Sequence, residues 1–253
     1  MRIRSCGKSD IGRVRKVNQD AFRCDDELGL YIVADGMGGH AAGEVAAQEA
    51  VQAIHDMIAR GHDVVRDFLR APATRESSRV ICRLLESAVQ SATYLVYGMA
   101  EQKPNYQGMG TTVSALLLAG AYGITAQVGD TRIYCVRGDD AVQLTEDHTL
   151  VNWQIREGML TPDEAARSPH RNVITRAVGN HDYVQVDTQI VSVRIGDKFL
   201  ICSDGLHGYV KRGEIPAVMA GDLGAACETL VSLANQRGGR DNITAVAIEV
   251  CGE

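Results

Sequence analysis

The chain has 253 residues, of which 45% are hydrophobic and 23% are charged, and its formal net charge is −6. This composition is typical of a folded globular protein with a substantial core, and it argues against a disordered chain. No basic stripe stands out, so we expect no nucleic acid among the partners.

The cysteines and the apolar segments indicate where the protein works. The seven cysteines are odd in number, widely spaced and without a C-x-x-C pair, which argues against a disulfide framework and a structural zinc site. The N-terminus lacks the apolar core of a signal peptide, and the most apolar stretch, 113–128, is interrupted by glycines and a glutamine. We therefore expect a cytoplasmic protein without a membrane span.

The first half of the chain predicts one buried strand and two long helices. The apolar run from Tyr31 to Ala34 ends in Asp-Gly, which indicates a buried strand followed by a turn. Apolar residues at three- and four-residue spacing predict amphipathic helices over 44–60 and about 78–101. Gly61 fits the end of the first helix.

The second half predicts mainly short strands. Four runs of β-forming residues between 112 and 144, separated by glycines, indicate an antiparallel meander. Further strands are expected over 183–193, 198–202 and 242–250, with a helix over about 222–235. This grouping of helices and strands favours an α+β fold with antiparallel sheets. No low-complexity linker divides the chain, so we expect a single domain covering 1–253.

The polar segment 146–179, called the flap below, is predicted to be irregular apart from two short helices near 150–157 and 162–167. A segment of this length inside a compact domain is often a functional lid. It contains Trp153, the only tryptophan. We expect Trp153 to be buried against the flap rather than to contact substrate.

Four aspartates, each beside an apolar run and next to Gly, Asn or Thr, form the candidate site. Any one Asp-Gly or Asp-Asn pair is more often a turn or a local cap than a metal ligand, so only the joint pattern is specific. Carboxylates and a glycine carbonyl at strand ends suit Mg²⁺ or Mn²⁺ better than Zn²⁺. The four are Asp35, Asp130, Asp204 and Asp241.

A fifth element is the segment 12–20, which contains Arg13, Arg15 and Lys16. An arginine here could bind a phosphate through paired hydrogen bonds. Taken alone, such a segment is more often a solvated basic turn.

Together these motifs resemble the metal-dependent protein phosphatase family, protein phosphatase type 2C, in its compact bacterial form. The resemblance covers nearly the whole chain and keeps the order of the family's motifs. The motifs are Arg15 to Asp20, Asp-Gly-Met-Gly-Gly-His at 35–40, Gly-Thr-Thr at 110–112, Gly-Asp-Thr-Arg at 129–132, Arg-Asn-Val-Ile-Thr-Arg-Ala-Val-Gly at 171–179, Ser-Asp-Gly-Leu at 203–206 and Asp-Asn-Ile-Thr at 241–244.

The resemblance implies an α-β-β-α sandwich of two antiparallel sheets flanked by helices, with the flap over one end. It also implies two Mn²⁺ or Mg²⁺ ions and a third, weaker one near the flap. Asp35 would bridge the two ions, the Gly36 carbonyl would bind one of them, and Asp204 and Asp241 would bind the other. Asp130, with Asp204, would bind the third.

The implied reaction is hydrolysis of phosphoserine and phosphothreonine in proteins, with metal-activated water attacking phosphorus in line. Arg15 would orient the phosphoryl group and Asp20 would act through metal-bound water, while His40 is a candidate either for catalysis or for packing. The implied partners are phosphoproteins, including a cognate Ser/Thr kinase or its substrates, in bacterial signalling. The alternative is a non-catalytic pseudophosphatase that binds phosphoproteins.

Overall fold

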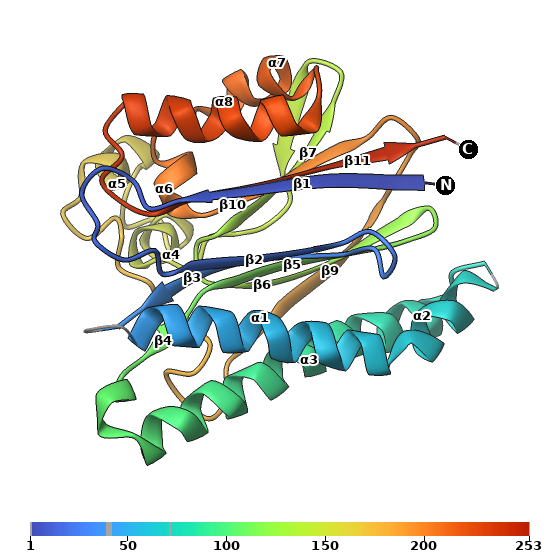
Figure 1. Ribbon diagram of the computed structural model, residues 1–253, viewed down its shortest axis with the longest axis horizontal. Coiled ribbons are helices and arrows are strands. Elements are labelled where there is room, and N and C mark those ends of the chain that lie inside the picture. The colour runs from blue at the N-terminus through green and yellow to red at the C-terminus, as the bar shows by residue number, and fades with distance from the viewer. Residues whose placement is uncertain (1, 39–41, 71, 253) are drawn as a thin grey trace.

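The computed structural model describes residues 2–38, 42–70 and 72–252. Two antiparallel β-sheets lie face to face, and helices cover both outer faces (Figure 1). In spatial order, the first sheet contains β1 (Arg2–Asp10), β11 (Ile243–Cys251), β10 (Lys198–Cys202), β7 (Arg132–Arg137) and β8 (Asp140–Gln143). The second contains β2 (Asp20–Asp25), β3 (Leu30–Met37), β5 (Val113–Ala119), β6 (Tyr122–Val128) and β9 (Asp187–Ser192), with β4 (Gly110–Thr111) paired to β3.

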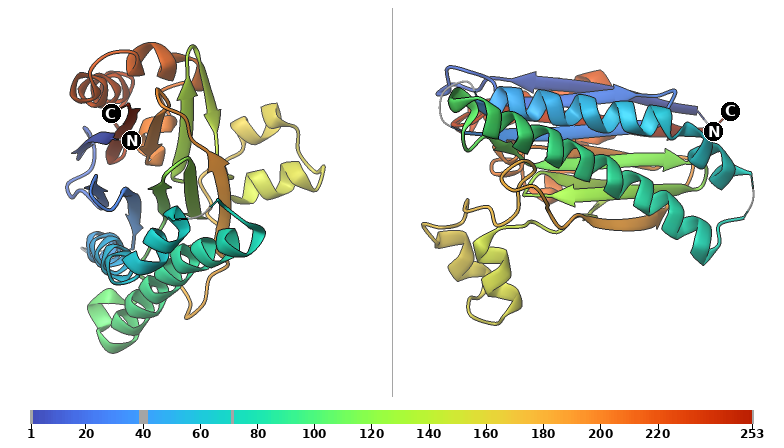
Figure 2. Two further views of the ribbon diagram at one scale, coloured as in Figure 1. Left: turned by 90° about the vertical axis from the view of Figure 1, so that its right-hand side faces the viewer. Right: turned by 90° about the horizontal axis from the view of Figure 1, so that it is seen from below.

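The helices form the two outer layers and the flap, which projects to one side of the sandwich (Figure 2). The sheet containing β3 is covered by α1 (Ala42–Arg60), α2 (His62–Leu69) and α3 (Arg75–Gln102), followed by the short η1 (Pro104–Tyr106). The sheet containing β11 is covered by α6 (Asp204–His207), η2 (Arg212–Glu214), α7 (Ile215–Met219) and α8 (Leu223–Gln236). The flap contains α4 (Leu150–Arg156) and α5 (Pro162–Arg167).

The core has three layers because side chains alternate between the two faces of each strand. In β3, Leu30 and Ile32 pack toward the helices, whereas Tyr31 and Val33 pack against the other sheet. Phe199 of β10 is fully buried in this middle layer, where burying one such side chain contributes about 1.5 to 3 kcal/mol. Burial on both faces explains why β3 is a continuous apolar run rather than an alternating one.

The expected α-β-β-α sandwich is confirmed, and so are the two long helices and the two short flap helices. The single meander over 112–144 is wrong in one respect. The chain forms the β5–β6 hairpin in one sheet and then crosses to the other sheet, where β7 and β8 pair. The crossing occurs at Gly129, whose φ of +97° is readily adopted only by glycine. The strand expected over 183–193 is limited to β9.

Candidate active site

Two of the site carboxylates lie opposite each other on neighbouring strands. The register of β2 and β3 pairs Asp20 with Asp35. The end of β3 is fixed by Thr112, whose hydroxyl accepts the Asp35 N–H at 3.0 Å and whose own N–H donates to the Asp35 carbonyl at 2.9 Å. A Cβ at Gly36 would lie 2.0 Å from the Gly43 carbonyl oxygen, so only glycine permits the close approach of α1 here.

Asp204 and Asp241 come from the other sheet, at the ends of two paired strands. Asp204 begins α6 directly after β10, and Asp241 lies just before β11, which pairs with β10. Asp204 lies close enough to Asp35 for its charge to raise the pKa of Asp35. The ends of the two sheets therefore bring carboxylates from distant parts of the sequence into one site.

Asp20 is held by two buried hydroxyl groups. Ser203 Oγ and Thr244 Oγ1 donate to Asp20 Oδ2 at 2.7 and 2.6 Å. The other oxygen, Oδ1, is buried and makes no hydrogen bond, and the same is true of Asp204 Oδ1. Buried carboxylate oxygens without a partner are costly and point to a cationic ligand.

The raised pKa values of the site carboxyls also point to a cationic ligand. Burial, together with the nearby Asp20 and Asp204 charges, raises the pKa of Asp35 well above its usual range. Burial also raises the pKa of Asp20 and of Asp130 to about 7. Cations bound here would relieve this concentration of negative charge.

The donors are hard oxygens, as Mg²⁺ and Mn²⁺ prefer. In the described part of the chain, no three acidic, His or Cys side chains are gathered closely enough to hold an ion by themselves. Backbone carbonyl and water oxygens would therefore have to complete the coordination of any ion.

The N-terminal segment reaches the site through Arg15 and is fixed there by Asn242. Arg15 Nη2 donates to Asp241 Oδ2 at 2.7 Å. Asn242 Nδ2 donates to the carbonyls of Ile11 and Val17, each at 3.0 Å, and its Oδ1 accepts the Gln19 N–H at 2.8 Å. Asn242 thus holds both ends of the loop that carries Arg15.

A cleft of about 770 Å³ opens between the flap and α6, and Asp130, Asp204 and Asp241 lie along it. The flap contributes apolar side chains of α4 and α5 to its wall. Arg171 and Arg240 also line it. Trp153 does not line this cleft and is 48% exposed, so the expectation that it is buried is wrong.

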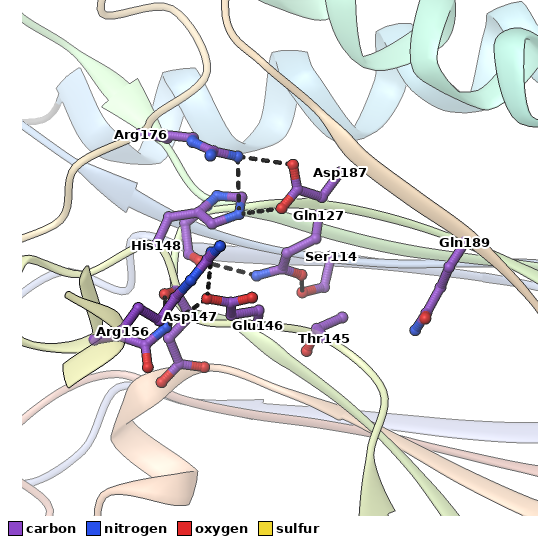
Figure 3. A network of polar contacts seen from close by, with 12 residues as sticks. Ser114, Gln127, Thr145, Glu146, Asp147, His148, Arg156, Arg176, Asp187 and Gln189 are labelled. Atoms are coloured by element: carbon purple, nitrogen blue, oxygen red, sulfur yellow. Dashed lines mark hydrogen bonds and ion pairs between the residues drawn. The ribbon is translucent and has the colours of Figure 1, made fainter. Parts of the chain in front are cut away.

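His148 joins the flap to the turn that carries Asp130, and Figure 3 shows its ring beside Arg176 and Asp187. Its ring Nδ1 accepts the Gly129 N–H at 3.1 Å, and its Nε2 lies 3.0 Å from Asp187 Oδ2. Arg176 donates to the second Asp187 oxygen at 2.8 Å. Because Nδ1 accepts, the ring is neutral with its proton on Nε2, which donates to Asp187.

The structure brings together the described residues that the sequence proposes as metal ligands, with Asp20 and Arg15. Asp20, Asp35, Gly36, Asp130, Asp204 and Asp241 converge with Arg15, whereas His40 lies outside the described residues. Sequence reasoning missed Ser203, Thr244 and Asn242, although each stands next to a candidate ligand or within its motif. It took His148 to be structural, and the hydrogen bonds of His148 to Gly129 and Asp187 agree with this.

Comparison with known proteins decides the family. A model of the family described as protein phosphatase 2C matches residues 6–222. The chain belongs to the protein phosphatase 2C family. It is 34% identical to serine/threonine phosphatase stp of Listeria innocua, over 96% of this chain and 94% of the relative. It is 36% identical to protein phosphatase PhpP of Streptococcus pneumoniae, over 96% of this chain and 95% of the relative.

Solved structures of bacterial serine/threonine phosphatases share the fold. The serine/threonine phosphatase PstP/Ppp of Mycobacterium tuberculosis superposes with a TM-score of 0.87 and 32% identity, covering 100% of both chains. The catalytic domain of PstP in complex with two manganese ions superposes with a TM-score of 0.83 and 32% identity, covering 99% of both. This chain is accordingly a protein serine/threonine phosphatase.

Proposed function

We propose that the convergent carboxylates hold two Mn²⁺ or Mg²⁺ ions and that the protein uses them to hydrolyse phosphoserine and phosphothreonine. Asp35 would bridge the ions, the Gly36 carbonyl would bind one, and Asp204 and Asp241 would bind the other. The observation that carries this assignment is the partnerless buried oxygen of Asp204, beside Asp35 in a site of raised carboxyl pKa. The two manganese ions of the PstP relative support the number of ions.

The other residues of the site have distinct tasks. When bound, the divalent ions supply positive charge that lowers the pKa of water and stabilises charge on the phosphoryl group. Arg15, presented beside Asp241, would orient the phosphoryl oxygens through its planar guanidinium. Asp20, fixed by Ser203 and Thr244, would accept hydrogen bonds from ordered water through its free oxygen.

Two assignments extend beyond the central pair of ions. Asp130, with Asp204, would bind a third ion, and its buried position with a pKa of about 7 supports this role. His40 stays a prediction as a catalytic residue. Replacing His40 with Ala and measuring the pH dependence of kcat would test it.

The phosphorylated segment of the substrate would lie in the cleft between the flap and α6. Asp130, Asp204 and Asp241 line this cleft, and its wall also contains apolar flap residues and Arg171. Such a wall suits a protein segment that carries both apolar and acidic side chains around the phosphorylated residue. Every carboxylate of the expected set is present, and so we do not favour the non-catalytic alternative.

The remaining proposals concern context. We propose one phosphatase domain over 1–253 with residues 146–179 as its flap, acting in bacterial signalling against a cognate Ser/Thr kinase or its substrates. The shared middle layer between the sheets supports the single domain. In the described ranges, no helix has the length and apolar character needed to cross a bilayer. Seven free cysteines support a reducing, cytoplasmic location.

The test is hydrolysis of a phosphothreonine peptide by purified protein with Mn²⁺, with Mg²⁺ and with excess chelator. We expect activity only with metal, and loss of activity and of Mn²⁺ binding in Asp35→Asn. Asp139→Asn, in the exposed β7–β8 turn, is the matched control and should behave as wild type. Full turnover in chelator, or unchanged activity in Asp35→Asn, would contradict the proposal.

A further inference from the structure

A second groove lies outside the active site, between the N-terminal half of α3 and β9. It has a volume of about 640 Å³ and is called the edge groove below. Arg75, Arg79 and Arg83 line its helical wall, and residues 188–190 of β9 line the other. Figure 2 shows β9 at the outer edge of its sheet, beside α3.

The helical wall of the edge groove is strongly basic. The three arginines follow one another at four-residue intervals and therefore share one face of α3. All three are exposed, and none takes part in an ion pair within the described residues. Glu86 is the one acidic residue on the groove wall. The groove therefore carries a net positive charge on a protein whose overall charge is negative.

The strand wall offers free backbone groups. The Val193 N–H donates to the Ala121 carbonyl at 2.8 Å, so residues of β9 at odd positions face β6, and those at even positions face away from it. Thr188 and Ile190 thus direct their backbone N–H and C=O groups toward the open edge. In the part of the chain that the structure describes, these groups make no backbone hydrogen bond.

We propose that the edge groove binds an extended acidic segment of a partner protein, which adds a strand to β9 and places carboxylates against the arginines of α3. Residues four apart on a helix are separated by about 6 Å along its axis, and alternate residues of a strand by about 6.7 Å. An acidic residue at every second position would therefore match the spacing of Arg75, Arg79 and Arg83. Backbone pairing supplies affinity, and the arginines supply specificity.

The N-terminal half of α3, which forms the helical wall of the edge groove, lies at the end of the molecule away from α4, α5 and α6 (Figure 1). A segment bound there leaves the active-site cleft open. If the bound protein is also the phosphorylated substrate, the groove would raise the local concentration of substrate, and this consequence rests on the proposed function.

The first experiment measures binding of a fluorescein-labelled, unphosphorylated ten-residue peptide with glutamate at alternate positions. Fluorescence anisotropy is recorded in chelator, so that the result does not depend on metal or activity. The triple variant Arg75→Glu, Arg79→Glu, Arg83→Glu should bind at least about tenfold more weakly. A matched control triple changes exposed arginines of β1, β2 and η2 and has the same net charge: Arg2→Glu, Arg23→Glu and Arg212→Glu. Its affinity for the peptide should stay within about twofold of that of wild type. Equal weakening in both triples would overturn the proposal.

A second pair of variants tests strand addition. Thr188→Pro removes an N–H that faces the open edge and leaves the bonds to β6 in place, whereas Thr188→Val keeps that N–H. We expect about fivefold weaker peptide binding for the proline variant and wild-type binding for the valine variant. Unchanged binding by Thr188→Pro would overturn strand addition.

Hydrolysis of p-nitrophenyl phosphate with Mn²⁺ should be unaffected in all these variants, and an inactive wild type would count against the proposed function alone.

Discussion

His148 binds Gly129 twice. Its backbone N–H donates to the Gly129 carbonyl at 2.9 Å, and its ring Nδ1 accepts the Gly129 N–H at 3.1 Å. The carbonyl of His148 also accepts the Thr175 N–H at 2.8 Å. One buried residue thus joins both ends of the flap to the turn that carries Asp130. A change in the position of the flap would therefore shift the Asp130 carboxylate.

Replacing His148 with Ala should destabilise the protein by about 2 kcal/mol, because the buried Gly129 N–H loses its acceptor and Asp187 loses a donor. Urea unfolding followed by circular dichroism measures the change. His170→Ala is the matched control, since His170 is an exposed histidine of the same flap, and it should change stability by less than about 0.5 kcal/mol. Equal effects of the two substitutions would refute the structural role of His148.

The pH dependence of stability should also depend on His148. Burial lowers the pKa of His148 in the folded protein, whereas the unfolded chain takes up its proton near about 6.5. As the pH falls below that value, the unfolded state binds more protons than the folded state, so the stabilisation from neutral His148 is lost. The pKa of Asp187, the partner of His148, is lowered from its ordinary value, so Asp187 takes up its proton only at a lower pH than this.

We therefore expect the free energy of unfolding of wild type to fall more between about pH 7 and pH 5 than that of His148→Gln. Urea titrations of both proteins at both pH values give the change in the free energy of unfolding for each. The difference between the two changes isolates His148, because the site aspartates contribute to both proteins alike. Parallel pH profiles would show that His148 does not titrate as described.

Ser203 and Thr244 should control metal affinity without contacting the ions. Thr244→Val removes the 2.6 Å hydrogen bond to Asp20, and Ser203→Ala removes the 2.7 Å one. Loss of either should weaken Mn²⁺ binding about tenfold, as changes behind a ligand shell commonly do. Isothermal titration calorimetry measures this directly. Ser9→Ala is the control, since Ser9 contacts Thr244 but not Asp20, and a Ser9 variant as weak as the other two would contradict the prediction.

The ion pair of Arg132 and Asp147 should contribute more to stability than the neighbouring, exposed ion pair of Glu146 and Arg156. Arg132 makes hydrogen bonds of 2.6 to 3.1 Å with both oxygens of Asp147, and the two side chains are only 25% and 15% exposed. Asp147→Ala should cost about 2 to 3 kcal/mol, since it leaves a half-buried cation unpaired. Glu146→Ala breaks a pair with Arg156 that is mostly exposed and should cost less than about 1 kcal/mol. Thermal unfolding of both variants tests the ranking, and a reversed order would refute it.

The residues of the candidate site could be predicted because each lies in a short, recognisable sequence pattern. Asp35, Asp204 and Asp241 each adjoin an apolar strand and a Gly or Asn, so the chemistry is visible within a few residues of sequence. Their convergence was not visible, because it depends on the pairing of β2 with β3 and of β10 with β11. Only the family resemblance supplied that arrangement in advance.

β1, β2 and the crossing between the sheets were not predicted from the sequence, each for its own physical reason. β1 and β2 carry many polar residues and are only partly buried, so they lack the apolar runs that identify buried strands. The crossing between sheets at Gly129 has the local sequence of an ordinary turn, and only tertiary packing separates β6 from β7. His148 gave no signal either, since a histidine bound to backbone groups needs no sequence motif.

The pairing of the first and last strands has a practical consequence. Arg2 of β1 stands opposite Cys251 of β11, and the two chain ends emerge side by side, away from the flap and α6 (Figure 1). A short linker could therefore join them, and new ends could be opened in an exposed loop such as the β7–β8 turn. A tag or a fused domain at either end would emerge at that same corner and leave the active-site cleft accessible.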